Sequence, residues 1–238
     1  MKTLKQLNKQ LSQIENSLAS LVAQRDAKPK DLFRISHEPA ASFVTLDADG
    51  TPTIHLHEGQ YKAYLDQSRF LLILAGTRGG KTSFGPWWLL RVMQRMGPGA
   101  YIAAAPSFRL LDKGVLPELK LAFVELLKLG TIVGGAMGEF RFSEEGHRRL
   151  WPNHPFSESR IVFGHADNPE SLEALTAKAA WLDEAGQRRF KQESWEAIRR
   201  RLSIAQGPAL FTTTPYLSAH WLKHDVYDRA MRSGTEKA

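Results

Sequence analysis

The spacing of apolar positions changes along the chain and predicts its elements. In the first region, leucine and isoleucine recur at intervals of three and four residues, at Leu4, Leu7, Leu11, Ile14, Leu18 and Leu21. This spacing puts one apolar stripe along a helix whose other face carries Lys, Gln, Asn, Ser and Glu. The stripe fits a short coiled coil or, as we favour, an amphipathic helix that lies on its own domain, because so short a coiled coil is marginally stable.

Next come a linker and a β-hairpin. Lys28-Pro29-Lys30 breaks the helical pattern, and Asp49-Gly50 predicts the turn of a hairpin within residues 42–57. His55 and His57 would share one face of its second strand, where two imidazoles could chelate a metal. With no third ligand nearby, an ordinary polar strand face is the favoured interpretation.

From residue 58 onward, apolar runs and helical patterns alternate. Strands are predicted at residues 71–74, 101–105, 140–142, 161–163, 179–182 and 209–213. Helices are predicted over residues 82–96, from 106 to about 129 with interruptions near Gly114 and Pro117, over 193–202, and from 218. The glycine-rich stretch 130–138 predicts a loop. Such alternation is typical of an α/β fold with a mostly parallel central sheet flanked by helices.

Composition narrows the functional classes. The absence of cysteine from the 238 residues excludes a disulfide framework, thiolate catalysis and cysteine-based zinc sites. No apolar run approaches the roughly 18 residues of a membrane span, and the N-terminal leucines are too interrupted for a secretory signal. The net charge of +7 suits a polyanion such as nucleic acid without requiring one.

The segment Ala75–Ser83, AGTRGGKTS, connects an apolar run to a helical pattern. This order is that of a P-loop (Walker A) motif, in which backbone N–H groups and a helix N-terminus surround phosphate. Lys81 would reach the β- and γ-phosphates, and Thr82 would place its hydroxyl on Mg²⁺. Ala75 replaces the usual first glycine, so the loop is a variant. The predicted ATP-binding residues here are Gly76, Thr77, Arg78, Gly79, Gly80, Lys81, Thr82 and Ser83.

A second half of the site is predicted where a buried strand ends in Asp183 and Glu184, as in a Walker B motif. Asp183 would hold Mg²⁺, and Glu184 would orient or deprotonate the attacking water. The hydroxyl-rich strand end Thr212-Thr213-Thr214 would report the nucleotide state. Upstream, the amide of Gln60 both donates and accepts, as the edge of adenine requires.

In this order, the elements resemble the ATPase domain of the large terminase subunit, the DNA-packaging motor of tailed bacteriophages. The resemblance spans residues 58–216 and rests on the segment around Gln60 and on Ala75–Thr82, Pro106–Arg109, Gly164–Leu172, Trp181–Glu184 and Thr212–Pro215. It implies a P-loop NTPase of the additional-strand (ASCE) type, with ATP and Mg²⁺ as cofactors. It also implies Gln60 at adenine, Lys81, Arg78 and Glu184 in catalysis, and Thr212, Thr213 and Thr214 as the coupling motif.

The same resemblance implies translocation of double-stranded DNA into a procapsid by a homo-oligomeric ring. A portal protein and the small terminase subunit are the implied partners, without a membrane. The implied place of action is the host cytoplasm, transiently docked on the procapsid. We expect an amphipathic helix over 1–27, a linker and hairpin over 28–57, and an ATPase domain over 58–238. The nuclease domain usual in the family is absent, either by excision or by nature.

Two features depart from the family pattern. A basic residue often occupies the position of Thr77, so Arg78 either reaches the γ-phosphate or only holds the loop. Many relatives carry an arginine shortly before the Walker B strand, where this chain offers Glu173 and Lys178. An arginine acting on a neighbour's ATP would then come from another position, and the candidates are Arg148, Arg149, Arg160, Arg199, Arg200 and Arg201.

Basic clusters at residues 148–149, 188–191 and 199–201 are either DNA-phosphate contacts or solvated helix faces. Two alternative functions stay open at this point. One is another nucleic-acid-stimulated ATPase, such as a helicase, which would separate strands. The other is an assembly module that binds ATP with little turnover.

Overall fold

The structure, a computed structural model, describes residues 31–38, 40–135, 138–167, 176–215 and 220–232. The chain divides after Asp31 into two units, and the second, Leu32–Ala238, contains the elements that follow. The amphipathic helix predicted over 1–27 lies outside the described residues. None of the helices within the described ranges has the length and apolar character that crossing a membrane requires.

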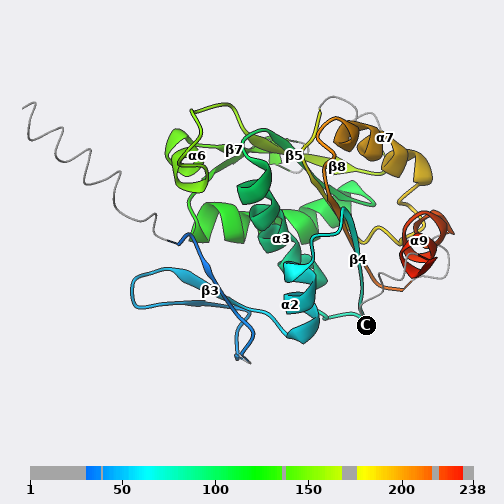
Figure 1. Cartoon of the computed structure of the whole chain (residues 1–238), viewed down its shortest axis with the longest axis horizontal. Helices are drawn as coiled ribbons and strands as arrows, with labels where there is room; N and C mark the ends of the chain where they lie inside the picture. The colour runs from blue at the N-terminus through cyan, green and yellow to red at the C-terminus, as the bar shows by residue number, and fades with distance from the viewer. Residues whose placement is uncertain (1–30, 39, 136–137, 168–175, 216–219, 233–238) are drawn as a thin grey trace, which may run out of the picture. The chain divides into compact units, whose positions relative to one another are not determined.

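A seven-stranded sheet forms the centre of this unit, in the order β4-β10-β9-β5-β8-β7-β6 (Figure 1). Strands β4, β10, β9, β5 and β8 pair in parallel, and β7 and β6 continue the sheet antiparallel. The predicted mostly parallel sheet is confirmed. The strand bounds are Phe70–Leu74 (β4), Ala100–Ala105 (β5), Gly130–Val133 (β6), Glu139–Phe142 (β7), Arg160–His165 (β8), Ala180–Asp183 (β9) and Ala209–Thr213 (β10).

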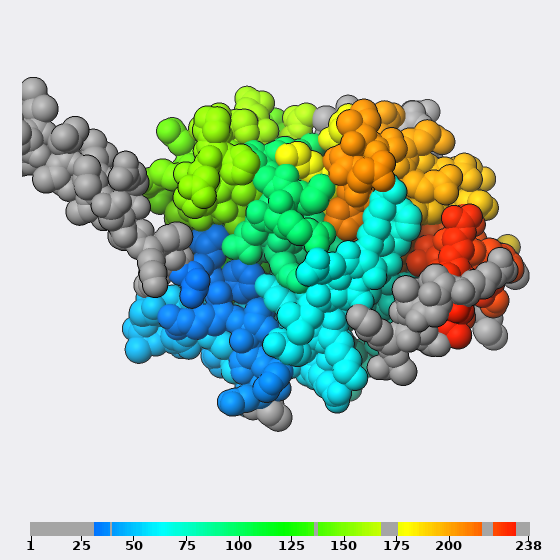
Figure 2. Space-filling view, viewed as in Figure 1, coloured from blue at the N-terminus to red at the C-terminus, as the bar shows by residue number. Residues whose placement is uncertain are grey.

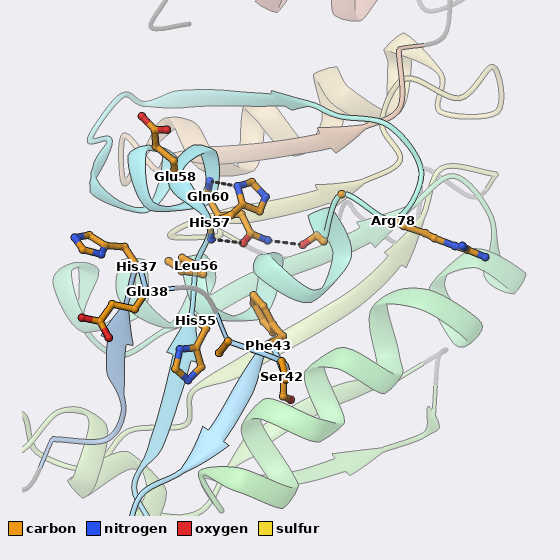
Figure 3. A pocket seen from close by; sticks show the side chains of 14 residues that line it. His37, Glu38, Ser42, Phe43, His55, Leu56, His57, Glu58, Gln60 and Arg78 are labelled. Carbon is orange, nitrogen blue, oxygen red and sulfur yellow. Dashed lines mark hydrogen bonds between the residues drawn. The ribbon is translucent and has the colours of Figure 1, made fainter.

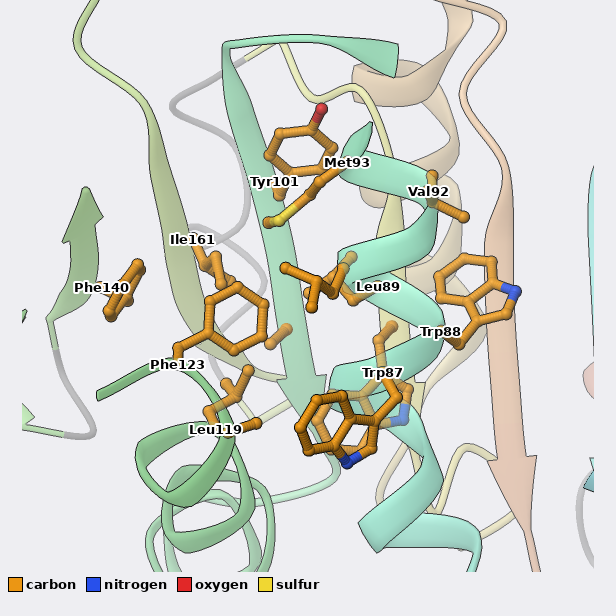
Figure 4. Close-up of a cluster of buried hydrophobic side chains, with 14 of the residues drawn as sticks. Trp87, Trp88, Leu89, Val92, Met93, Tyr101, Leu119, Phe123, Phe140 and Ile161 are labelled. Atoms are coloured by element: carbon orange, nitrogen blue, oxygen red, sulfur yellow. The ribbon is translucent and has the colours of Figure 1, made fainter. Parts of the chain in front are cut away.

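Helices cover both faces of the sheet. Since successive strand residues point to opposite faces, each strand contributes side chains to both cores. In β5, Tyr101 and Ala103 belong to one core with the apolar face of α3, and Ile102 and Ala104 belong to a second core with α7. Figure 4 shows part of the first core, where Leu89 of α3 and Phe123 of η2 meet over β5. The helix bounds on this sheet are Lys81–Met96 (α3), Phe108–Leu110 (α4), Leu111–Val115 (η1), Leu116–Leu119 (α5), Lys120–Leu126 (η2), Glu144–Leu150 (α6), Gln192–Ser203 (α7), His220–Leu222 (α8), Lys223–Tyr227 (η5) and Asp228–Arg232 (α9).

A smaller sheet with the order β1-β3-β2 precedes α2 (Glu58–Leu65), and Figure 2 shows it (blue) directly against the segments that follow it in the chain (cyan). Its strands are Arg34–Ser36 (β1), Val44–Leu46 (β2) and Pro52–His55 (β3). β2 and β3 pair antiparallel, with Gly50 at φ 78 in the turn, so the predicted hairpin is confirmed. β1, which was not predicted, pairs parallel with β3. Ile54 is fully buried in the same core as α3, so this sheet packs on the larger fold.

The predicted common strand face of His55 and His57 is wrong. The strand ends at His55, and His57 is instead the N-cap of α2, where its Nδ1 accepts a hydrogen bond from the backbone N–H of Gln60. His55 donates or accepts a hydrogen bond at Nε2 with the hydroxyl of Thr45, at 2.8 Å.

The predicted loop over 130–138 is also wrong at its start. Gly130–Val133 is strand β6, in a hairpin with β7. Gly130 is a close-approach glycine, because a Cβ there would lie 1.9 Å from the carbonyl oxygen of Arg141. Gly134 and Gly135, at φ 75 and 56, use the conformational freedom of glycine for the turn that follows β6.

The helical segment after β5 continues past Gly114 and Pro117 without the predicted interruptions. Two wide π-helical stretches, η1 and η2, alternate with ordinary helix, and Pro117 lies just after the junction of η1 and α5. α6 was not predicted. It begins at a local signal, since the hydroxyl of Ser143 accepts from the backbone N–H of Gly146 at 3.0 Å.

Candidate functional site

The loop between β4 and α3 surrounds the ammonium group of Lys81. This side chain is 6% exposed, and its Nζ donates to the carbonyl oxygens of Ala75 at 2.9 Å and Gly76 at 2.8 Å. Gly80, the N-cap of α3, and Arg78 are both left-handed, at φ 67 and 64. The loop thus holds the cation of Lys81 against its own carbonyl oxygens and ends at the N-terminus of α3, and a helix N-terminus attracts phosphate.

Two segments far apart in the chain meet at Asp183. The hydroxyl of Thr82, 101 residues away, donates to Oδ2 at 3.0 Å, and the hydroxyl of Thr212 donates to Oδ1 at 2.6 Å. The sheet order explains this meeting, because β10 lies between β4 and β9 and its end is adjacent to that of β9. The carboxyl ends of parallel strands thus bring the predicted metal ligands together.

The side chain of Trp181 supports the contact between Thr212 and Asp183. Its Nε1 donates to the hydroxyl of Thr212 at 3.1 Å, which leaves that hydroxyl's own proton for Asp183. We had not predicted this role for Trp181. The signal was present, since a tryptophan in a buried strand needs a partner for its N–H.

Glu184 lies beside Asp183 but faces a different neighbour. Its backbone is left-handed, at φ 50, and its half-buried carboxylate lies 3.4 Å from the hydroxyl of Thr214 and 3.5 Å from the Thr214 backbone nitrogen. A non-glycine residue in this conformation is a strained one that the surrounding structure must hold. With this backbone conformation, the consecutive carboxylates of Asp183 and Glu184 face different partners, Thr212 and Thr214.

The three threonines predicted as one coupling motif have three different contacts. Thr212 bonds Asp183, and Thr214 faces Glu184. The hydroxyl of Thr213 accepts from the backbone N–H of Gly186 at 3.0 Å and donates to the carbonyl of Thr214 at 2.9 Å. This set of bonds connects the ends of β9 and β10, and the coupling role itself stays a prediction.

Other residues of the predicted set lie differently. Ser83 donates to Oε1 of Glu118 at 2.8 Å, a contact across to α5 that we had not predicted. Gly76, Thr77 and Arg78 are exposed, and the guanidinium of Arg78 points away from the neighbouring cavity in Figure 3. Residues 168–175, which include the end of the segment Gly164–Leu172 that carries the family resemblance, lie outside the described residues.

Cavities between described residues adjoin the loop. One, of about 610 Å³, lies between the small sheet and the loop and is lined by residues that include Phe43, His55, His57 and Gly80 (Figure 3). The second, of about 360 Å³, runs between α2 and β4. Gln60 and Gly79 line both cavities.

The candidate trans arginines differ in how they are held. Arg148 pairs with Glu145, Arg160 lies 3.6 Å from Glu139, and Arg149 donates to the carbonyl of Leu127 at 2.7 Å. On α7, Arg199 and Arg200 are exposed and Arg201 is half-buried. Lys178, near the position where relatives carry arginine, donates to the carbonyl of Met96 at 2.9 Å.

The oxygens of Thr82 and Asp183 fit Mg²⁺, which takes hard oxygen ligands and needs only one or two from the protein when phosphate and water complete its shell. Within the described ranges there is no cluster of three or more His, Asp or Glu side chains that could hold a metal by itself. Thr82 and Asp183 would supply oxygen ligands to the metal, and phosphate and water would complete its shell.

Burial raises the pKa of Asp183 to about 6, against the lowering effect of hydrogen bonds from Thr212 and Thr82. The folded-state pKa exceeds the unfolded value of 3.8. Protonated Asp183 therefore contributes to the stability of the folded state. This contribution is fully present below the unfolded pKa and is lost as the pH rises through about 6.

We therefore expect Asp183→Asn, measured without divalent metal, to raise the melting temperature more at pH 8 than at pH 5. At pH 8 the free energy of unfolding should rise by about 1–3 kcal/mol, because the amide of asparagine is never ionised. The measurement is thermal unfolding in EDTA at both pH values, with the exposed Asp112→Asn as the matched control. An equal change at the two pH values would contradict the expected ionisation.

No protein-family sequence profile and no curated protein sequence matches the chain. Solved structures do match. The large terminase of a thermophilic bacteriophage has a TM-score of 0.58 at 13% identity, over 74% of this chain and 43% of that one. The HK97 bacteriophage large terminase has a TM-score of 0.58 at 16% identity, over 81% and 40%. The ATPase domain of the Thermus phage P74-26 large terminase has a TM-score of 0.52 at 19% identity, over 68% and 66%.

The first of these terminases has also been solved with ADP and with ATP-gamma-S. This chain spans less than half the length of that protein and of the HK97 terminase. In all three comparisons the similarity covers more than two thirds of this chain. The described unit therefore has the P-loop NTPase fold of the phage large terminases.

Proposed function

We propose that this chain is the Mg²⁺-dependent ATPase motor domain of a large terminase, which drives double-stranded DNA into a procapsid. The observation that carries the proposal is the 3.0 Å contact of Thr82 with Asp183, which joins the start of α3 to the end of β9. In a P-loop ATPase these two residues would hold the Mg²⁺ that accompanies the triphosphate. The position of β10 between β4 and β9 supports the additional-strand type.

The roles follow from the site. Lys81 and the loop residues from Gly76 to Ser83 would hold the triphosphate, and Thr82 and Asp183 would hold Mg²⁺, which neutralises developing charge on the phosphates. Glu184 would orient or deprotonate the attacking water. Arg78 would have to turn from its exposed position to reach the γ-phosphate. Of the three threonines, Thr214 is best placed to sense the attacking water, because it contacts Glu184.

The partners follow from the likeness alone. We propose a homo-oligomeric ring on DNA, docked through a portal protein on the procapsid in the host cytoplasm and supplied with DNA by the small subunit. The exposed arginines Arg188 and Arg189 follow β9, and with Arg199 and Arg200 they are candidate DNA-phosphate contacts.

Phosphate release per chain is expected to depend on Mg²⁺ and to rise with protein concentration, because in a ring each site needs an arginine from its neighbour. Such an arginine is worth about 10³–10⁵ in turnover. The assay is steady-state phosphate release over a range of protein concentrations with double-stranded DNA, with Lys81→Ala as background. A rate independent of concentration would contradict the ring, and no turnover above background would contradict the ATPase. Strand separation of the same DNA, measured in parallel, would favour a helicase.

A further inference from the structure

One buried side chain, that of Trp181, contacts the elements that carry the candidate metal ligands. It lies on β9, two residues before Asp183, and is fully buried. Its Nε1 donates to the hydroxyl of Thr212 on β10, at 3.1 Å. Its ring also packs on α3, where a Cβ at Gly85 would lie 2.0 Å from Cε2, and Gly85 follows Thr82 by about one helical turn. The indole therefore lies where α3, β9 and β10 meet.

The hydroxyl of Thr212, which is fully buried, connects this indole to the carboxylate of Asp183. A hydroxyl has one proton and two lone pairs, and the indole N–H, which can only donate, uses a lone pair. The proton of Thr212 has a close acceptor in Oδ1 of Asp183, at 2.6 Å, and a distant one in the carbonyl of Leu182, at 3.5 Å. Because hydrogen bonds in a chain polarise one another, the indole strengthens the bond from Thr212 to Asp183.

Both carboxylate oxygens of Asp183 are thus held, Oδ1 by Thr212 and Oδ2 by Thr82. Rotation of the carboxylate would break at least one of these bonds, so its remaining lone pairs have a fixed direction. Hydrogen-bond partners that orient metal ligands typically change the metal affinity about 10–100-fold when they are replaced. A group that strengthens such a partner should therefore act on the metal affinity as well.

We propose that Trp181 is a positioning residue for the metal site: through Thr212 it fixes the carboxylate of Asp183 and so raises the affinity for Mg²⁺. The inference rests on the proposed function, since it takes Thr82 and Asp183 to hold Mg²⁺ beside a nucleoside triphosphate. The indole N–H donates to Thr212, so Trp181 acts through that hydroxyl and not on the nucleotide. Phosphate binding by the loop and Lys81 should not depend on it.

The test measures binding of ATP-γ-S by calorimetry over a range of Mg²⁺ concentrations and in EDTA. Trp181→Phe keeps an aromatic ring and removes the N–H. We expect it to raise the Mg²⁺ concentration needed for half-maximal binding roughly threefold to tenfold, as the loss of one hydrogen bond does. The affinity in EDTA should stay the same, because the loop and Lys81 bind the phosphates without the metal. Trp195→Phe, at a tryptophan buried in the second core, is the matched control and should change neither value.

A double variant tests whether Trp181 acts through Thr212. Thr212→Val has nearly the same shape without the hydroxyl, and it should raise the required Mg²⁺ concentration about tenfold to a hundredfold. Adding Trp181→Phe should raise it no further, because the hydroxyl that connects the indole to Asp183 is already absent. A further increase in the double variant would overturn the inference.

An unchanged Mg²⁺ dependence in Trp181→Phe would also overturn it, and so would an equal loss of affinity with Mg²⁺ and in EDTA. Failure of the parent protein to bind ATP-γ-S, or binding without any effect of Mg²⁺, would instead contradict the proposed function. Thermal unfolding is measured first, because Trp181 is a core side chain. If Trp181→Phe does not fold, 3-benzothienylalanine at position 181 keeps the shape of the indole and replaces only its N–H by sulfur, and the same comparison applies.

Discussion

Glu184→Gln is expected to leave the protein folded and able to bind nucleotide while lowering ATP turnover about 10²–10⁴-fold, the usual contribution of a general base. Glutamine has the shape of glutamate, so one oxygen still accepts from Thr214, whose hydroxyl lies 3.4 Å from the native carboxylate. What the substitution removes is the negative charge that attracts the proton of the attacking water. Binding of ATP depends on the loop and on Lys81, and it should therefore persist.

Single-turnover phosphate release and nucleotide affinity, measured on the same samples, check this expectation. Glu125→Gln, the same substitution on η2 at an exposed position, is the matched control and should retain full turnover. Rapid turnover by Glu184→Gln would show that another group activates the water. Loss of nucleotide affinity would place Glu184 in binding instead of hydrolysis.

Gly85→Ala is expected to destabilise the protein by about 3 kcal/mol or more, at the upper end of overpacking effects. A Cβ at Gly85 would lie 2.0 Å from Cε2 of Trp181, with two further indole atoms within 2.5 Å. The indole has no free direction in which to move, because it is fully buried and its Nε1 is bonded to Thr212. Any shift of this ring would disturb Asp183, which Thr212 holds at 2.6 Å.

Urea unfolding measures this effect, and near-ultraviolet circular dichroism reports the environment of the tryptophan. The matched control is Gly114→Ala, a second helical glycine, whose Cβ would meet only Cγ2 of Thr82, at 3.9 Å. That change should stabilise by roughly 0.5–1 kcal/mol, because alanine is the better helix former. In a Trp181→Phe background the smaller ring should lessen the cost of Gly85→Ala. Equal stability of Gly85→Ala and the parent protein would refute the close packing.

Much of this protein could be predicted from local patterns in the chain. The apolar run Phe70–Leu74, the glycine loop and the helix from Lys81 are consecutive, so their spacing alone predicted the phosphate cradle. An apolar strand ending in Asp183 predicted the second half of the site in the same way. Such elements are readable because their signals lie within a few residues of one another.

Contacts between distant residues were decided only by the tertiary structure. Pattern could not order the strands, and it is the place of β10 between β4 and β9 that puts Thr212 on Asp183 and Thr214 on Glu184. Gly130 resembles a loop residue in sequence, yet the approach of Arg141 makes it part of a strand. The amide of Gln60 donates to the carbonyl of Gly80, a contact that the sequence could not predict, because a side chain's hydrogen-bond partner depends on what the whole chain brings within about 3 Å.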